Sequence, residues 1–543
     1  MKKILTLLGI LLLSLTLAAC QQTTDPKDND NNDDDMSWKK EYDMVDTSPH
    51  FEENVDVCYQ IFPISYADSN NDGYGDLQGI TNNLDYLSET LNVDCLWLNP
   101  IHPSNTYHKY DVIDYYAIDD RLGTLDDYET LLEEAETRGI KVLMDFVVNH
   151  TADDHPWFIN SRSSKESDYR DWYIWNDLSD KAAYPSQDGW YFDNGEYYYA
   201  SFWDQMPELN LDNPEVREEL KSIATFWLDK GVDGFRIDAA KHLYDLNEYP
   251  RGTNLLEENT GFFKELNAHI KSINPDSFIV GEIWSESSSY IGNFYEGMDS
   301  TFNFPLSEAI IDGLLTGTAT PITDVMVDLD AEYSETRETY IDSIFLTNHD
   351  QNRIIDQLNG NLEKAQLAAA INFTLPGISW VYYGEELGMT GVKPDESIRQ
   401  PFIWGEDDPR NVQGQSGGIA DWNPYNAALD GVIKQLANTS SMLNHYQTLI
   451  TLKQTNQALA HGDFMMVNND HSRLLAYLMV ADNQTLLIIH NMSQLEQSVS
   501  HTLSTHTVLY GSDTINLTDS MLTLDPLESV VIEIDETDVT LTE

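Results

Sequence analysis

The chain has 543 residues, enough for roughly two to four domains, and its 41% hydrophobic content is normal for a globular protein. The charge balance is unusual, because 92 acidic residues against 30 basic ones give a formal net charge of −62. This charge repels nucleic acid and anionic lipid headgroups, so we exclude nucleic acid as a partner. The simplest interpretation of the charge is an acidic, solvated surface that favours solubility.

The N-terminus has the pattern of a bacterial lipoprotein signal. Lys2 and Lys3 precede an apolar run over 4–17, and the small residues that follow lead to Cys20. The run is too short for a comfortable membrane span, and the small residues suit a cleavage site. Cleavage would leave a lipidated Cys20 as the new N-terminus. The alternative is an ordinary secretory signal with an incidental cysteine.

The acidic segment after Cys20 is expected to be a disordered tether over residues 21–45, because it is rich in Asp and Asn. The predicted location is therefore the extracellular face of the bacterial membrane, with Cys20 as the only membrane contact. Cys58 and Cys95 remain, each inside an apolar run. A disulfide is one interpretation for an exported protein, but cysteine is also a common buried residue, and we expect two reduced core thiols.

Eight apolar runs of strand length recur along the chain. They cover 55–62, 93–98, 141–148, 234–239, 278–284, 298–304, 344–348 and 378–383. Helical stripes lie between them; one follows Pro214, ends at Gly231, and consists of Val216, Leu220, Ile223, Ala224, Trp227 and Leu228. Strands that alternate with helices over about 400 residues predict an α/β fold, a (β/α)₈ TIM barrel with insertions, whose active site lies at the C-terminal strand ends.

The run at 234–239 carries charged residues on one face. Phe235 and Ile237 alternate with Arg236 and Asp238, so a strand would place the charged pair together. From these residues alone, a structural ion pair and a catalytic pair are equally good interpretations.

Three more runs end in chemically active residues. These ends are Asp145-Phe-Val-Val-Asn149-His150, Gly281-Glu282-Ile-Trp284 and Thr347-Asn348-His349-Asp350. With the run at 234–239, they resemble the defining regions of the α-amylase family of glycoside hydrolases. The resemblance covers nearly the whole chain from about residue 50. It implies a retaining glycosidase, with Asp238 as the nucleophile, Glu282 as the general acid/base and Asp350 as a third carboxylate that grips sugar hydroxyls.

The resemblance also implies substrate-binding residues. Arg236 would keep the nucleophile ionised by lowering its pKa, and Tyr110 would stack under a sugar ring. His108 replaces an acidic residue that closes the non-reducing end in many oligo-1,6-glucosidases, which favours an open cleft. The remaining residues are His150 and His349 in the cleavage subsite, Lys241 and His242 on the leaving-group side, and Arg399 behind the sugar contacts.

A loop after the first run has the donors of a calcium site. Asp68, Asn70, Asp72, the Tyr74 carbonyl and Asp76 alternate around a glycine, as a hard cation requires. An EF-hand is rejected because position twelve of the loop is a glycine. In the α-amylase family this loop binds calcium; the alternative is a metal-free Asx turn.

A second family calcium site would use Asn149, the His242 carbonyl and an aspartate at the position that we assign to Asn210. The neutral side chain of Asn210 argues against that site.

The resemblance also implies the domain organisation. The domains are a signal peptide (1–20), a tether (21–45), the first part of the barrel domain A (46–150), domain B (151–211), the second part of domain A (212–459) and an antiparallel β-sandwich, domain C (460–543). Domain B is rich in Trp, Tyr and Asp, for which packing and sugar binding are both open interpretations. Its end, Met206-Pro-Glu-Leu-Asn210, resembles a group intermediate between α-amylases and oligo-1,6-glucosidases. A last barrel helix is predicted over 445–459.

The sequence thus predicts a lipid-anchored, calcium-binding retaining hydrolase, expected to be a monomer, that cleaves α-1,4 bonds in starch or maltodextrins. One alternative is an α-glucosidase, a neopullulanase-like enzyme or a transglycosylase on the same barrel. The other is a maltodextrin-binding surface lipoprotein without catalysis. The presence of all three carboxylates, Asp238, Glu282 and Asp350, argues against this alternative.

Overall fold

The computed structural model describes Tyr42 and residues 55–542, with gaps at 180, 184–185, 251, 338–339, 415–417, 502, 504–505, 512–515, 519 and 536–538. The predicted signal peptide, Cys20 and, except for Tyr42, the tether lie outside the described residues. In the part of the chain that is described, no helix combines the length and the apolar character needed to cross a membrane.

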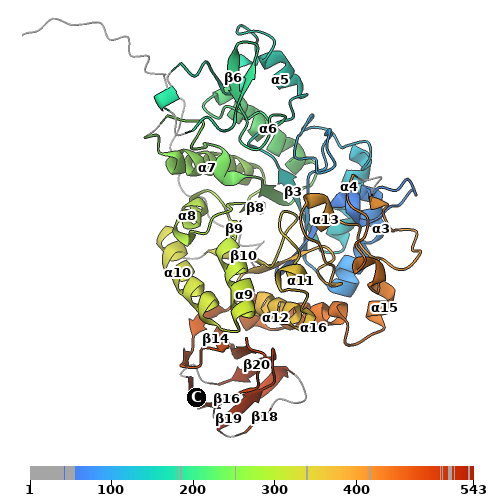
Figure 1. The fold of residues 1–543 in the computed structure, drawn as a ribbon, viewed down its shortest axis with the longest axis vertical. Coiled ribbons are helices and arrows are strands. Elements are labelled where there is room, and N and C mark those ends of the chain that lie inside the picture. Colours follow the sequence, from blue (N-terminus) through green and yellow to red (C-terminus); the bar gives the residue numbers. More distant parts are fainter. Residues whose placement is uncertain are drawn as a thin grey trace, which may run out of the picture. The chain divides into compact units, whose positions relative to one another are not determined.

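The described residues form a closed barrel of eight parallel strands, in the order β1-β11-β10-β9-β8-β7-β3-β2 (Figure 1). The strands are β1 (Val57–Ile61), β2 (Cys95–Leu98), β3 (Lys141–Phe146), β7 (Gly234–Ile237), β8 (Phe278–Gly281), β9 (Ser300–Phe302), β10 (Ile341–Phe345) and β11 (Ile378–Tyr382). Each overlaps one predicted run, which confirms the TIM barrel. Strand β10 begins three residues before its predicted run, because Asp342 and Ser343 are polar and interrupt the apolar pattern there. Their side chains form hydrogen bonds with those of Asn303 and Ser300, respectively, in the neighbouring segment.

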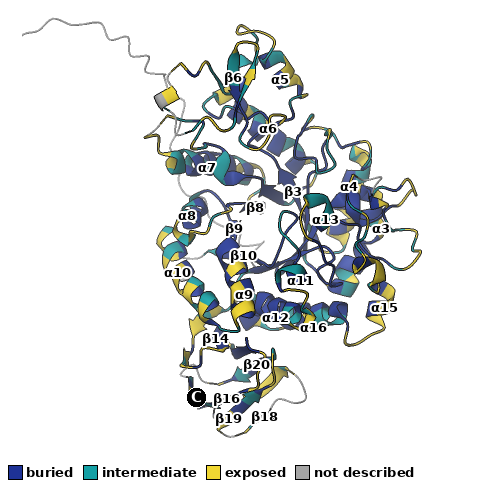
Figure 2. Cartoon of the chain, viewed as in Figure 1, coloured by how far each residue is buried: buried dark blue, intermediate teal, exposed yellow. Residues whose placement is uncertain are grey.

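Helices surround the barrel, and Figure 2 shows their inner faces buried and their outer faces exposed. The main ones are α3 (Leu77–Asn82), α4 (Leu125–Thr137), α6 (Pro214–Asp229), α7 (Leu255–Ile273), α9 (Phe304–Thr316), α10 (Thr320–Thr336), α12 (Leu362–Thr374) and α16 (Met442–Thr455).

Two helices test the predictions from sequence. Helix α6 begins as predicted, since the Asn213 side chain accepts the backbone N–H of Glu215 and Pro214 occupies the first turn; its predicted stripe is buried. The single last helix predicted over 445–459 is wrong. Asn456 has an extended backbone (φ −121°, ψ 106°) and separates α16 from a short helix, α17 (Gln457–His461).

Two further units interrupt or follow the barrel. After β3 the chain forms α5 (Pro156–Ser161) and a three-stranded sheet of β4 (Trp175–Asn176), β6 (Glu196–Tyr199) and β5 (Trp190–Asp193), and then returns through α6. The C-terminal region forms two five-stranded sheets, in the orders β12-β14-β15-β20-β17 and β13-β21-β16-β19-β18. Their inner faces share one apolar cluster, so the mainly antiparallel β-sandwich is confirmed.

The sandwich strands are β12 (Asp463–Met466), β13 (Asn468–Asn469), β14 (Leu474–Ala481), β15 (Gln484–Asn491), β16 (Gln497–His501), β17 (His506–Tyr510), β18 (Asn516–Leu517), β19 (Met521–Leu524), β20 (Ser529–Ile534) and β21 (Thr540–Thr542). Strands β14 and β15 form a hairpin whose last paired residues are Ala481 and Gln484. Asp482 and Asn483 therefore form the two-residue turn of this hairpin.

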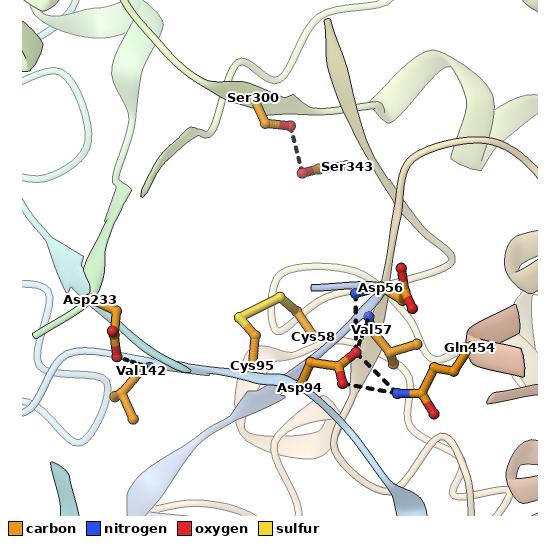
Figure 3. The surroundings of a disulfide bond; sticks show 10 residues. All are labelled: Asp56, Val57, Cys58, Asp94, Cys95, Val142, Asp233, Ser300, Ser343 and Gln454. Carbon is orange, nitrogen blue, oxygen red and sulfur yellow. Dashed lines mark hydrogen bonds between the residues drawn. A yellow bond between two sulfur atoms is a disulfide. The ribbon is translucent and has the colours of Figure 1, made fainter. Parts of the chain in front are cut away.

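The prediction of two reduced core cysteines is wrong, because Cys58 and Cys95 form a disulfide (Figure 3). Strands β1 and β2 are neighbours, and their register places the two cysteines directly opposite each other with a Cα–Cα distance of 4.4 Å. Both are fully buried in an apolar cluster of the barrel. The expectation of burial was correct, and the inference from burial to a free thiol was not.

Candidate active site

The loops at the C-terminal strand ends surround a cavity of about 480 Å³. Most of the predicted site residues line it: His108, Tyr110, His150, Asp238, Lys241, His242, Glu282, Asp350 and Arg399. Arg236 and His349 are fully buried and do not line it. The structure thus brings the predicted residues into one site and places these two behind the residues that line it.

Arg236 is the centre of the charge network. One guanidinium nitrogen, Nη1, lies 2.7 Å from Asp238 Oδ1, and the other, Nη2, lies 2.9 Å from Glu282 Oε2. Nη1 also contacts both oxygens of Asp145, at 2.9 and 3.1 Å. The predicted Arg236–Asp238 pair is therefore part of a group of three carboxylates around one cation.

Asp145 is a site residue for which the sequence pattern alone indicated no role. Its Oδ2 also accepts hydrogen bonds from Trp97 Nε1 at 3.1 Å and from the Tyr110 hydroxyl at 3.0 Å. A signal was present in the sequence, because a buried arginine has five donors and one aspartate cannot satisfy them. A second buried carboxylate was therefore to be expected near Arg236.

Burial and charge set the protonation of the two carboxylates at the cavity. Burial raises the pKa of Asp238; the Arg236 guanidinium acts to lower this pKa, as expected, and limits the rise without reversing it. Burial raises the pKa of Glu282 to about 7, and the negative charges of Asp238 and Asp350 act in the same direction against Arg236. Near neutral pH, the Glu282 carboxyl can therefore be protonated, and it can donate this proton to a molecule bound in the cavity.

Asp350 has the opposite character. Although burial acts to raise its pKa, the His349 ring and the Arg399 guanidinium lower it to about 2. Burial also lowers the pKa of His349 well below its usual value, so the charged partner is Arg399, whose Nη2 lies 2.7 Å from Asp350 Oδ1. Asp350 is thus ionised at neutral pH.

The backbone after the nucleophile candidate is strained. Ala239 has φ 49° and ψ 34°, a left-handed conformation that non-glycine residues rarely adopt. In this conformation its N–H points at Glu282 and donates to Oε2 at 3.0 Å. The strained residue therefore fixes the position of Glu282 beside Asp238.

Aromatic and imidazole rings line one side of the cavity. The Tyr110 ring lies parallel to His349 at 5.4 Å, and its hydroxyl contacts His349 Nε2 at 2.7 Å. Burial lowers the pKa values of His108 and His150 to about 4, so both are neutral at pH 7. A stacked ring beside neutral imidazoles suits a polyol, which offers an apolar ring face and hydroxyl groups.

The other side of the cavity is formed by the segments after β7 and β8. Lys241 Nζ donates to the backbone carbonyl of Trp284, and His242 Nδ1 lies 2.8 Å from Asp245 Oδ2. The indole of Trp284 stacks on Phe304 with ring centres 4.9 Å apart. Both basic residues are held by partners from the same end of the barrel.

The predicted calcium-binding residues lie in a tight loop from Asp68 to Asp76 that is rich in oxygen atoms. The Asp68 carboxylate accepts backbone N–H groups of Asn70, Asn71 and Gly73, and the Asp76 carboxylate accepts those of Ser69 and Gly79. The Asn70 and Asp72 side chains make the same kind of turn. Among the described residues, no Lys or Arg forms an ion pair with the three aspartates of the loop. The donor chemistry and the uncompensated charge of Asp68 and Asp76 fit a cation.

No group of three or more His, Cys, Asp or Glu side chains in the described part of the chain is arranged as a metal site. Asn210 was assigned to the position of a ligand in the second family calcium site, but its side chain does not pair with that of Asn149. Asn210 Nδ2 donates to the Asp171 carbonyl, whereas the side chain that receives a hydrogen bond from Asn149 is Glu208. Burial raises the pKa of Glu208 to about 8.

Comparison with known proteins agrees with this geometry. The family model for the α-amylase catalytic domain matches residues 60–462, and that for the C-terminal domain of the α-amylase SusG matches residues 474–531. Alpha-amylase 3 of Dictyoglomus thermophilum is 41% identical over 444 residues, 81% of this chain and 85% of that protein. An oligo-1,6-glucosidase of Halalkalibacterium halodurans is 32% identical, over 80% of this chain and 89% of that protein. The crystal structure of an α-amylase from H. orenii superposes with a TM-score of 0.79 at 35% identity, over 89% of this chain and all of that one.

Proposed function

Since this chain belongs to the α-amylase family of glycoside hydrolases, we propose that it hydrolyses α-1,4-glucosidic bonds in starch or maltodextrins with retention of configuration. The observation that carries the proposal is the single guanidinium, Arg236, that contacts both Asp238 and Glu282 at the edge of the cavity. Retention requires two carboxyl groups close together, one ionised and one protonated.

The proposed roles follow from the charges. Asp238 attacks the anomeric carbon while Glu282 gives its proton to the glycosidic oxygen, so that the leaving chain departs as an alcohol and a glycosyl ester forms on Asp238. Glu282 then takes a proton from water, which attacks the same carbon and frees Asp238. Asp350, with its low pKa, accepts hydroxyl hydrogen bonds from the sugar in the cleavage subsite.

Other cavity residues position the substrate. Tyr110 offers its ring to one sugar face, and the neutral His108 and His150 exchange hydrogen bonds with hydroxyl groups. Lys241 and His242 contact the sugar on the leaving-group side. Arg236 and Arg399 act through the carboxylates that they hold.

A product time course on amylose, pullulan and isomaltose tests the proposal. An α-amylase releases large amylose fragments early and leaves isomaltose intact. Early glucose, attack on isomaltose or products longer than the substrate would favour the α-glucosidase, neopullulanase-like or transglycosylating alternatives. Binding of maltodextrin with no hydrolysis under any condition would favour the binding lipoprotein.

We also propose calcium as the cofactor, held by Asp68, Asn70, Asp72, the Tyr74 carbonyl and Asp76. When bound, calcium would neutralise the buried carboxylates and hold the loop together. Calorimetry of chelator-treated protein with CaCl₂ should show binding and a higher Tm, and Asp68→Asn should weaken both effects. Equal Tm values with EDTA and with CaCl₂ would argue against the site.

The location is the last part of the proposal. Cys20 would carry the lipid and hold the protein on the extracellular face of the membrane. Cells grown with radioactive palmitate should label the wild type and not Cys20→Ser, and the variant should appear in the medium. Light scattering of that soluble variant would check the expected monomer.

A further inference from the structure

Gln60 is a buried glutamine of β1 that lies behind the cavity and does not line it. Its side-chain Nε2 lies 2.9 Å from Asn99 Oδ1 and 2.9 Å from His349 Nδ1. Asn99 Nδ2 in turn donates to the Tyr110 hydroxyl at 2.9 Å, and this hydroxyl lies 2.7 Å from His349 Nε2. The four side chains therefore close a ring of hydrogen bonds that includes both nitrogens of His349.

Asp145 sets the direction of the hydrogen bonds in this ring. Its oxygens face Arg236 Nη1 at 2.9 Å and Trp97 Nε1 at 3.1 Å, and both of these groups can only donate. Burial raises the pKa of Asp145 to about 7, so the carboxylate form is present from neutral pH upward. A carboxylate can only accept, and the Tyr110 hydroxyl, 3.0 Å from Oδ2, must therefore donate its single proton to Asp145.

This direction fixes the tautomer of His349. Because the Tyr110 proton is used, the Tyr110 oxygen accepts from Asn99 Nδ2 and from His349 Nε2. Asn99 then presents its carbonyl oxygen to Gln60, and Gln60 must present its NH₂ group, which donates to Asn99 Oδ1 and to His349 Nδ1. Burial lowers the pKa of His349 well below its usual value, so the ring is neutral and its one proton is on Nε2.

The position of this proton matters for a carboxylate at the cavity. His349 Nε2 also lies 3.2 Å from Asp350 Oδ2, while Arg399 Nη2 holds Oδ1 at 2.7 Å. A proton on Nε2 therefore faces Asp350 and the Tyr110 oxygen, and both can accept it. In the other tautomer, the lone pair of Nε2 would face these two oxygens and repel them.

We propose that Gln60 is a positioning residue of the active site, which keeps the proton of His349 on Nε2 by donating to Nδ1. In this way Gln60 orients Asp350 and Tyr110 without contact with the substrate. The effect on catalysis rests on the proposed hydrolysis of α-glucans, whereas the tautomer of His349 can be measured without any activity.

The first test is ¹⁵N NMR of the full-length protein at pH 8, with label in its 14 histidines. The signals of His349 are those that disappear in His349→Gln. In the wild type we expect a directly bonded proton on Nε2 and none on Nδ1. Gln60→Glu should move the proton to Nδ1, because an ionised carboxylate can only accept. A proton on Nδ1 in the wild type, or the same tautomer in Gln60→Glu, would overturn the proposal.

The second test is kinetic. Gln60→Met keeps the length of the side chain and removes both donors, so kcat/KM for maltoheptaose at pH 7 should fall about 10–100-fold, mainly through kcat. Gln60→Glu should lose more at pH 8, and its activity relative to the wild type should rise between pH 8 and pH 6. The introduced carboxyl is buried and takes up a proton in this direction, after which it can donate to His349 Nδ1 again.

Gln435→Met is the matched control for the loss of a buried amide. Gln435 is 5% exposed, donates to the carbonyls of Leu387 and Asp430 at 2.9 Å each, and does not line the cavity. The variant should lower Tm and change kcat/KM less than twofold. An equal loss of kcat/KM in both methionine variants, or none in Gln60→Met, would contradict the role of Gln60. Absence of hydrolysis by the wild type on every α-glucan would instead overturn the proposed function, and NMR would still decide the tautomer.

Discussion

At the C-terminal end of the barrel, Asp145, Asp238 and Glu282 share one arginine beside a cavity, whereas aspartates at the N-terminal end accept backbone hydrogen bonds from the neighbouring strand. Asp233, directly before β7, accepts the N–H of Val142 at 2.9 Å, as Figure 3 shows. Asp238, directly after β7, faces the cavity. The same residue type thus has two roles at the two ends of one strand.

The N-terminal pattern recurs. Asp94, directly before β2, accepts the N–H groups of Asp56 and Val57 (Figure 3), and Asp299, directly before β9, accepts that of Ile279. Each aspartate satisfies N–H groups at the start of the adjacent strand, which would otherwise lack a partner in the sheet. An aspartate before a barrel strand therefore indicates stability, and a carboxylate after one indicates chemistry.

The largest expected effect comes from the two ends of β7. Asp238→Asn should lower kcat on maltoheptaose by about 10³-fold or more with Tm little changed, because the nucleophile is lost and the amide keeps the shape. Asp233→Asn should leave kcat unchanged and lower the free energy of unfolding by about 1–2 kcal/mol. Steady-state kinetics and urea unfolding of both variants measure the difference. A catalytic loss in Asp233→Asn similar to that in Asp238→Asn would break the comparison between the ends.

Asp145→Asn should affect both quantities, because Asp145 belongs to the charge network and supports the site from inside the barrel. Arg236 would lose one of three anionic partners, which should cost about 3–5 kcal/mol of stability. Because Arg236 also contacts Asp238 and Glu282, a change in the position of its side chain should lower kcat about 10–100-fold with a smaller change in KM. If kcat and stability both stayed at the wild-type level, the three-carboxylate network would have no functional meaning.

The pH dependence of the reaction should follow the two carboxylates at the cavity. Glu282 must be protonated to act as an acid, so kcat/KM should fall about tenfold per pH unit above its pKa of about 7. Asp238 must be ionised, so activity should also fall in acid, at a higher pH than for an exposed aspartate because burial raises its pKa. The profile for maltoheptaose should be bell-shaped. A rate that stays constant from pH 7 to 9 would contradict the role of Glu282.

Most of the barrel and most of the residues that line the cavity could be predicted from the sequence, because strand runs and strand-end motifs are local patterns. What escaped prediction depends on register between strands. Asp145 and Arg236 are direct partners across β3 and β7, and Cys58 and Cys95 are direct partners across β1 and β2. Residues far apart in sequence become neighbours only when the register is known. This explains why Arg236 was given one partner and why the cysteines were expected to be free.

The smallest effect on activity is expected from the disulfide at the N-terminal end. Cys58→Ala together with Cys95→Ala should lower the free energy of unfolding by up to about 4 kcal/mol, because the bond closes a loop with a sequence separation of 37. It should leave kcat/KM at 25 °C unchanged, since the bond is buried in the apolar cluster of the barrel and away from the cavity lining. Urea unfolding and kinetics check both statements, and peptide mapping without reductant should recover the two cysteines linked. A large catalytic loss with little change in stability would mean that the N-terminal end of the barrel positions the reacting carboxylates, and the division between the two ends would then be wrong.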